Sequence, residues 1–201
     1  MFTALQALLN SLAVTFDLPI LDWIQAHLQC TFLDVTMPIV TLFGDGGVFW
    51  IAVAVVLLLF AKYRKTGFSM GMALVLGLLV CNILLKPQVA RIRPYNFQLQ
   101  EYGREITLLV KGLNDYSFPS GHTIASFEAC TVLMLHDKRL GIPATILAIL
   151  IAFSRLYLYV HYPTDVLVSL VLGILFGFLG SYIVDRIYKK KVYNGKYSLE
   201  E

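Results

Sequence analysis

Five long apolar runs restrict the folds that this chain can adopt. They cover residues 48–61, 67–85, 123–135, 142–153 and 166–184, and each can extend into its flanks towards the roughly 20 residues of a membrane-spanning helix. Charged residues make up only 14% of the 201 positions, against about 25% in soluble domains. The sequence therefore excludes a disordered chain, a nucleic-acid-binding tail and a conventional soluble enzyme. It predicts an all-α, polytopic helical bundle in a membrane.

The segments outside the runs predict how the chain is organised. Residues 1–44 mix apolar and polar side chains at helical spacing, so this N-terminal helical region is expected to supply a sixth helix, either across the membrane or along its surface. No repeat or low-complexity segment divides residues 1–201, which indicates a single membrane-embedded domain. Residues 86–120 form the one long polar segment, which we predict to be an extracytoplasmic loop at the functional site.

The Lys and Arg residues predict the orientation of the bundle. Ten of the sixteen follow the first, third or fifth run, and in an antiparallel bundle these three positions lie on one side. Short cytoplasmic loops are enriched in Lys and Arg, so we expect this side to be cytoplasmic. The chain is then a multi-pass protein of the cell membrane. The other six cations fall on the outer side, where they require a specific role.

Three polar motifs lie at the outer ends of the runs. They read KPQVARIRP (86–94), PSGH (119–122) and SRLYLYVHYPTD (154–165). The first follows the second run, the next precedes the third run, and the last joins the fourth run to the fifth. Because these ends share one membrane face in an antiparallel bundle, we expect the three motifs to form a single site at the outer face.

The residue types in these motifs predict a site for a phosphate group. Lys86, Arg93 and Arg155 converge in the expected arrangement, and guanidinium groups match phosphate oxygens in pairs. Ser120 and Gly121 open a helix, so backbone N–H groups and the positive end of the helix dipole also face the anion. The three Cys residues are widely spaced in apolar surroundings, which indicates packing rather than a disulfide framework or a metal site.

The histidines of the motifs predict reactivity. His161 has Asp165 four residues further on, and a carboxylate that accepts from one imidazole nitrogen leaves the other nitrogen nucleophilic. His122 is then available to protonate the leaving oxygen. An attacking base, a proton donor and a set of cations predict a phosphomonoesterase that needs neither a metal nor another cofactor.

The pattern K-x6-RP, PSGH and SR-x5-H-x3-D resembles the signature of the type 2 phosphatidic acid phosphatase superfamily, and all of its defining residues are present in order. The resemblance covers about residues 45–185. It implies that His161 attacks phosphorus and forms a phosphohistidine, that Asp165 orients His161, and that His122 is the general acid. It also implies that the phosphoryl oxygens are held by Lys86, Arg93, Ser120, Gly121 and Arg155.

The expected function is that of an integral membrane lipid phosphatase of the cell envelope. The substrate would be a phosphate or diphosphate monoester of a lipid in the bilayer, with undecaprenyl diphosphate favoured and phosphatidylglycerol phosphate or phosphatidate as the alternative. A non-catalytic carrier of lipid phosphates and a vanadate-dependent oxidase are the rival interpretations. We expect no nucleic-acid partner, and the oligomeric state stays open.

Two further features are left with open roles. Glu128 lies inside the third run, about 9 Å deeper than His122 along a helix, and an inter-helix hydrogen bond or a protonated side chain is favoured over a direct function. Residues 95–116 form a long loop with an apolar stretch at 106–110. We consider that this stretch could lie on the membrane as a lid.

Overall fold

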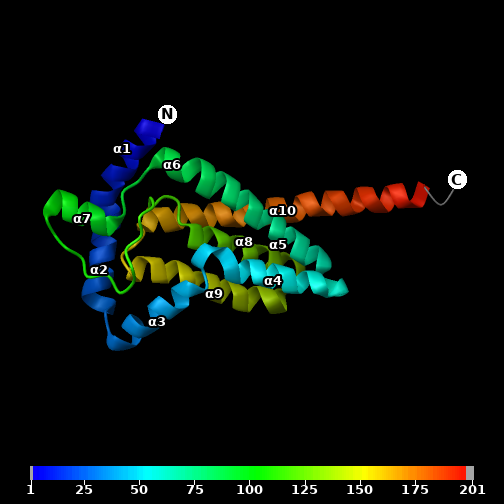
Figure 1. Ribbon diagram of the computed structural model, residues 1–201, viewed down its shortest axis with the longest axis horizontal. Coiled ribbons are helices and arrows are strands. Elements are labelled where there is room, and N and C mark those ends of the chain that lie inside the picture. The colour runs from blue at the N-terminus through cyan, green and yellow to red at the C-terminus, as the bar shows by residue number, and fades with distance from the viewer. Residues whose placement is uncertain (1, 198–201) are drawn as a thin grey trace.

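The computed structural model describes residues 2–197, with side chains described from residue 6 to residue 190. Within these limits the chain is helical and contains no strand (Figure 1). The long elements are α1 (Phe2–Leu12), α2 (Leu18–Leu28), α3 (Thr31–Leu42), α4 (Val48–Leu59), α5 (Arg64–Gly77), α8 (Gly121–His136), α9 (Lys138–Tyr157) and α10 (Pro163–Tyr197). The shorter ones are η1 (Ala13–Asp17), η2 (Asp45–Gly47), η3 (Ala61–Tyr63), η4 (Leu78–Leu85), α6 (Lys86–Val89) and α7 (Pro94–Tyr102).

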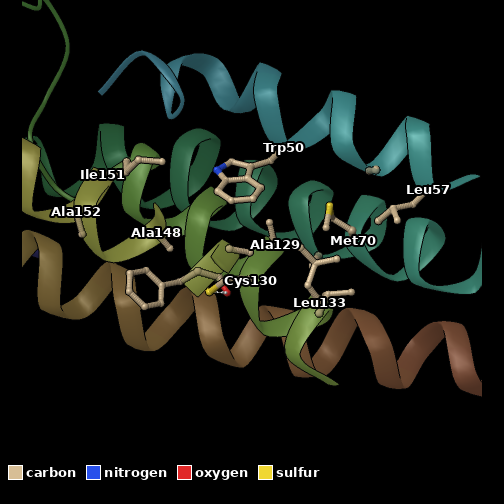
Figure 2. Close-up of a cluster of buried hydrophobic side chains, with 14 of the residues drawn as sticks. Trp50, Leu57, Met70, Ala129, Cys130, Leu133, Ala148, Ile151 and Ala152 are labelled. Carbon is tan, nitrogen blue, oxygen red and sulfur yellow. Dashed lines mark hydrogen bonds between the residues drawn. The ribbon is translucent and has the colours of Figure 1, made fainter. Parts of the chain in front are cut away.

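Helix α8 lies at the centre of a bundle that it forms with α4, α5, α9 and α10. Apolar side chains from these helices meet around it, including Trp50, Met70, Leu133 and Ile151 (Figure 2). The indole Nε1 of Trp50 donates to the Ser126 hydroxyl at 3.0 Å, so the largest buried ring also satisfies its polar atom. The core of the protein is therefore the set of interfaces around α8.

Helix α10 approaches α8 closely because a glycine faces the contact. A Cβ atom at Gly173 would lie 2.8 Å from the Ile124 carbonyl oxygen, which is too close for any other residue. Small residues at such contacts let two helix backbones pack tightly in a membrane. The contact, together with the hydrogen bond from the Ser120 N–H to the Ser169 hydroxyl, keeps the start of α8 beside the second and third turns of α10.

The predicted all-α membrane fold is confirmed. Five stretches of described helix are long and apolar enough to cross a membrane, namely Gln6–Leu28, Thr31–Leu59, Ala61–Tyr102, Lys138–Tyr157 and Pro163–Lys190. Helix α8 has only 16 residues and packs in the middle of the bundle. Large apolar side chains such as Val55, Ile146 and Val171 remain exposed on the outside of the bundle, as contact with lipid requires.

The N-terminal helices run across one end of the bundle. Figure 1 shows α1 and α2 nearly perpendicular to α4, α8 and α10, at the end where α6 and α7 lie. Helix α2 packs against α9, and Leu21 and Ile24 are buried there. The stretch Gln6–Leu28 is thus long enough for the expected sixth span, but in the structure it covers the end of the bundle that carries the polar motifs.

The polar segment 86–120 contains two short helices, α6 and α7, followed by irregular chain. Its apolar stretch contacts protein in the structure: Ile106 and Leu108 pack against the cluster that contains Leu21 and Tyr159, and Val110 packs against the neighbouring cluster. The lid stays a prediction. Burying these side chains against α2 and the α9–α10 turn removes them from water without a membrane surface. The segment therefore packs between the N-terminal helix α2 and the bundle and contacts both.

Candidate active site

The three motifs meet at a cavity of about 340 Å³ at the end of the bundle that α1 and α2 cross. The predicted site residues that line it come from α6, the start of α7, the start of α8, the end of α9 and the α9–α10 turn. They are Lys86, Arg93, Gly121, His122, Arg155 and His161. Residues up to 75 positions apart thus face one enclosed space, which we call the site cavity.

Arg93 and His161 face the same point of the site cavity. The Nη1 atom of Arg93 lies 3.3 Å from Nε2 of His161, and both side chains are about 2% exposed. Arg93 Nη1 also donates to the Val160 carbonyl at 2.7 Å, which fixes the guanidinium beside the imidazole. A single anion can therefore contact both groups.

Asp115 occupies the space between two of the cations. Its carboxylate accepts from Lys86 Nζ at 2.6 Å and from Arg93 Nη2 at 2.5 Å. Partial burial alone would raise the pKa of Asp115, but the hydrogen bonds and positive charges of Lys86 and Arg93 outweigh burial and lower it to about 2. The sequence analysis did not identify Asp115, because the loop that carries it has no motif.

Arg155 is 3% exposed and reaches the site cavity from the last turn of α9. Its Nη1 donates to the hydroxyl of Thr41, a residue of α3. The family resemblance does not extend to residues 1–44, yet Thr41 positions this cation. Thr41 sits in an apolar stretch, and nothing in that stretch signals such a contact.

His161 lies in the turn between α9 and α10 with its imidazole buried. Burial and the positive charges of Arg93 and Arg155 hold the pKa of His161 well below its usual range. The ring is therefore neutral at pH 7, and a neutral ring has one nitrogen free to act as a nucleophile. Its Nδ1 lies 3.5 Å from Oδ2 of Asp165 and has no hydrogen-bond partner among the described residues.

Asp165 is held mainly by Arg91. Arg91 Nη1 donates to Asp165 Oδ1 at 2.5 Å, while Nη2 donates to Asp17 Oδ2 at 2.7 Å and to the Leu9 carbonyl at 2.8 Å. The guanidinium lies 3.7 Å from the centre of the Tyr162 ring, within range of a cation–π contact. Asp17, Arg91 and Asp165 are each no more than 1% exposed. We call these three residues the buried charge cluster.

His122 has a carboxylate partner from another part of the chain. Its Nε2 lies 2.7 Å from Oδ1 of Asp45, which is in η2 between α3 and α4. Asp45-Gly46-Gly47 forms a turn that brings a carboxylate to the imidazole. Asp45 orients the ring, but burial and the positive charges of Arg155 and Arg93 lower the pKa of His122 to about 2, so the imidazole is neutral at pH 7.

Ser120 differs from the expectation in one respect. It precedes α8 and is fully buried, but its N–H donates to the Ser169 hydroxyl at 2.8 Å, and the residue does not line the site cavity. The contact with α10 turns this N–H into the bundle. The free N–H groups at the start of α8 are those of Gly121 and His122, because the first turn of a helix has no carbonyl partners.

No cluster of three or more His, Cys, Asp and Glu side chains that could hold a metal occurs in the described part of the chain. Cys81 and Cys130 are buried and Cys30 is exposed, and all three are free thiols.

The sequence of the chain matches the model of a known protein family. The family model of the PAP2 superfamily matches residues 66–189, which is more than half of the chain and includes all three motifs. The chain belongs to the PAP2 superfamily. The resemblance noted in the motifs is thus confirmed.

Named relatives of this PAP2 protein are phosphatases of lipid phosphates. An undecaprenyl-diphosphatase from Sulfolobus acidocaldarius is 37% identical over 131 residues, covering 65% of this chain and 61% of the relative. Phosphatidylglycerophosphatase B from Bacillus subtilis is 33% identical over 155 residues, covering 71% and 64%. The chain thus spans about three-fifths of the length of the curated relatives it matches.

A solved structure shows the same membrane fold. The transmembrane PAP2-type phosphatidylglycerolphosphate phosphatase from Bacillus subtilis superposes with a TM-score of 0.72 at 27% identity, covering 92% of this chain and 93% of that one. The likeness extends over nearly the whole chain. The protein is accordingly a multi-pass membrane protein of this fold.

Replacing Arg91 with Met should destabilise the protein strongly. The change leaves Asp17 and Asp165 as two buried carboxylates without a cation, which costs about 3–5 kcal/mol of unfolding free energy. A thermal unfolding scan of detergent-purified protein measures the loss. Arg104→Met is the matched control, because the Arg104–Asp22 pair is exposed and contributes less than about 1 kcal/mol. Equal stability of the two variants would contradict the role of the buried charge cluster.

Replacing Asp115 with Asn should tighten anion binding. Asp115 competes with a phosphate for Lys86 and Arg93, so the variant should lower the inhibition constant of vanadate about five- to tenfold. Because the pKa of Asp115 is about 2, its carboxylate is ionised over the whole range from about pH 5 to 8, and the gain should be constant there. Glu101→Gln, an exposed site on α7, is the control; weaker vanadate inhibition of Asp115→Asn would refute the competition.

Proposed function

We propose that this PAP2 protein hydrolyses a phosphate or diphosphate monoester of a membrane lipid. The observation that supports the proposal most is the 3.3 Å approach of Arg93 Nη1 to His161 Nε2, in a cavity that Lys86, Arg155 and His122 also line. This arrangement places a neutral imidazole against the position of a phosphoryl group whose charge two guanidinium groups and one ammonium group neutralise. The site combines a nucleophile with stabilisation of the charge that develops during transfer.

In the proposed first step, Nε2 of His161 attacks phosphorus and a phosphohistidine forms. The bond between phosphorus and the lipid oxygen breaks, and His122 gives its proton to that oxygen, so the lipid leaves as an alcohol or a monophosphate. In the second step His122 takes a proton from water, the water oxygen attacks phosphorus, and the N–P bond breaks. Inorganic phosphate leaves, and both histidines return to their initial state.

Carboxylates adjust the two histidines for these steps. Asp45, 2.7 Å from Nε2 of His122, orients that ring. The negative charge of a bound phosphoryl group offsets the cations that lower the pKa of His122, which lets the ring carry the proton that the first step needs. Asp165 lies 3.5 Å from Nδ1 of His161 and accepts a hydrogen bond from the Nδ1–H when the distance shortens around a bound substrate, as hydrogen bonds in ligand-free sites often do. Arg91 keeps the Asp165 carboxylate from turning away. Asp165 and Asp45 are therefore proposed as positioning residues.

Undecaprenyl diphosphate is the favoured substrate, and phosphatidylglycerol phosphate or phosphatidate is the second candidate. The first is supported by relatives named undecaprenyl-diphosphatase, and the second by the relative and the structure named for phosphatidylglycerol phosphate. The distribution of Lys and Arg supports an extracytoplasmic position for the site cavity, because the loops at the other end of the bundle carry most of these residues.

Phosphate release from these lipids tests the proposal. Detergent-purified protein should release phosphate from at least one of undecaprenyl diphosphate, phosphatidylglycerol phosphate and phosphatidate in the presence of a chelator, and vanadate should inhibit it. His161→Ala should lose at least about 1,000-fold in turnover, because nucleophile and acid act as a unit. His27→Ala, an exposed residue far along the N-terminal helices, serves as the control. A strict need for added Mg²⁺ would contradict the mechanism. Phosphate release that persists in His161→Ala would also contradict it, and is the result that the non-catalytic carrier predicts.

The role of His122 can be tested separately through the leaving group. His122→Ala should lose at least about 100-fold in turnover of an alkyl phosphate, because an alkoxide leaves poorly without a proton. It should lose far less with p-nitrophenyl phosphate, whose phenolate leaves unprotonated. The reaction is quenched rapidly without acid, and the amount of phosphohistidine formed measures the first step for each substrate. Equal losses would remove His122 from the role of general acid.

A further inference from the structure

The site cavity continues from the charged groups into the apolar part of the bundle. Beyond Gly121 and His122 its walls are formed by α4, by the α5–η4 helix and by α8. The apolar side chains that line this part are Ile51, Leu74, Leu78, Ile124 and Ala125. Ile51 and Leu78 are about half exposed, so this part borders the lipid-facing surface of the bundle.

The shape of the bundle explains this opening. Helices α4 and α5 pack tightly at the end away from the site, where a Cβ atom at Gly67 would lie 2.8 Å from the Ala54 carbonyl oxygen. Towards the site the two helices separate (Figure 1). A lipid whose phosphate lies between Arg93 and His161 can therefore extend its chain between α4 and α5.

Glu128 lines the inner part of the site cavity, among the apolar residues. It is 1% exposed, and its Oε1 has no hydrogen-bond partner among the described residues. None of the ion pairs in the described part of the chain includes it. The carboxyl group lies against Gly77 of α5, where any side chain would collide with it. The Oε1 atom of Glu128 thus lacks a hydrogen-bond partner at the edge of a cavity, and native structures rarely contain a buried polar atom without one.

The position of Glu128 relates it to the leaving group of the proposed substrate. Glu128 follows Gly121 by seven positions, or about two helical turns, so both residues lie on the same face of α8 about 10 Å apart. Side chains on a helix point towards its N-terminus, and for α8 that is the end with His122. The carboxyl group therefore lies in the apolar part of the site cavity, on the side where the leaving lipid of the proposed substrate extends.

We propose that Glu128 is a specificity-determining residue that donates a hydrogen bond to the first oxygen-bearing group of the leaving lipid. The inference rests on the proposed function. An isolated carboxylate in apolar surroundings is costly, so the neutral acid is the form that this position favours, and it presents an O–H donor. The acceptor is a phosphate or ester oxygen, supplied either by the inner phosphate of a lipid diphosphate or by the glycerol esters of a phospholipid.

Three short lipids separate these cases. Farnesyl phosphate has only hydrocarbon beyond the scissile oxygen, farnesyl diphosphate adds an inner phosphate, and dioctanoyl phosphatidate adds glycerol esters. Glu128→Leu should lower kcat/KM for the substrate with the acceptor about tenfold and change that for farnesyl phosphate less than about twofold. Glu128→Gln keeps a hydrogen-bond donor and should retain most of the discrimination between substrates. Ser181→Ala is the control: it removes a buried hydroxyl without a partner that lies outside the cavity, and it should leave the ratios of kcat/KM between the three substrates unchanged.

The outcomes assign or overturn the role. A loss confined to farnesyl diphosphate identifies the inner phosphate as the acceptor, and a loss confined to phosphatidate identifies the glycerol esters. Equal losses on all three substrates, or none, overturn the inference while leaving the proposed function intact. If the wild-type protein hydrolyses none of them, the proposed function fails first and the inference fails with it. Thermal unfolding of each variant shows whether a uniform loss reflects misfolding.

Discussion

The structure depends on the two-sided ion pair of Arg91 with Asp17 and Asp165. A guanidinium between two carboxylates is stable at this depth only because every partner is close and because Tyr162 covers its face. The interaction joins the N-terminal helices, the 86–120 segment and the first turn of α10, which are three separate parts of the chain. Removing Arg91 would leave two carboxylates without compensation in the region that supports His161.

The site cavity itself collects positive charge in a place where charge is expensive. Lys86, Arg93 and Arg155 approach one another, and backbone carbonyls, Thr41 and Asp115 supply the oxygens that compensate them. Burial keeps His161 neutral, and the same positive charges add to this effect, so the cations that attract a phosphoryl dianion also support the nucleophilicity of the imidazole. Glu128 contributes nothing to this balance, which is why its role is sought on the lipid side.

The sequence predicts the parts of this structure that periodicity and motif spacing encode. The five apolar runs correspond to α4, the α5–η4 helix, α8, α9 and α10, and the antiparallel order brings Lys86, His122 and His161 to one cavity. Asp17, Asp45 and Asp115 could not be assigned, because their partners lie 22 to 77 residues away and no local pattern connects them. The contacts of the apolar stretch at 106–110 could not be predicted either, because an apolar patch can pack against protein as well as against lipid.

The spacing of the buried charge cluster has a consequence for biogenesis. Arg91 follows Asp17 by 74 residues and precedes Asp165 by another 74, so synthesis from the N-terminus produces the first carboxylate long before its cation. No Lys or Arg precedes Lys62, and the leading helices therefore carry no positive charge to fix their own orientation. The N-terminal helices can therefore form the buried charge cluster only after Arg91 and then Asp165 at the start of α10 have been synthesised.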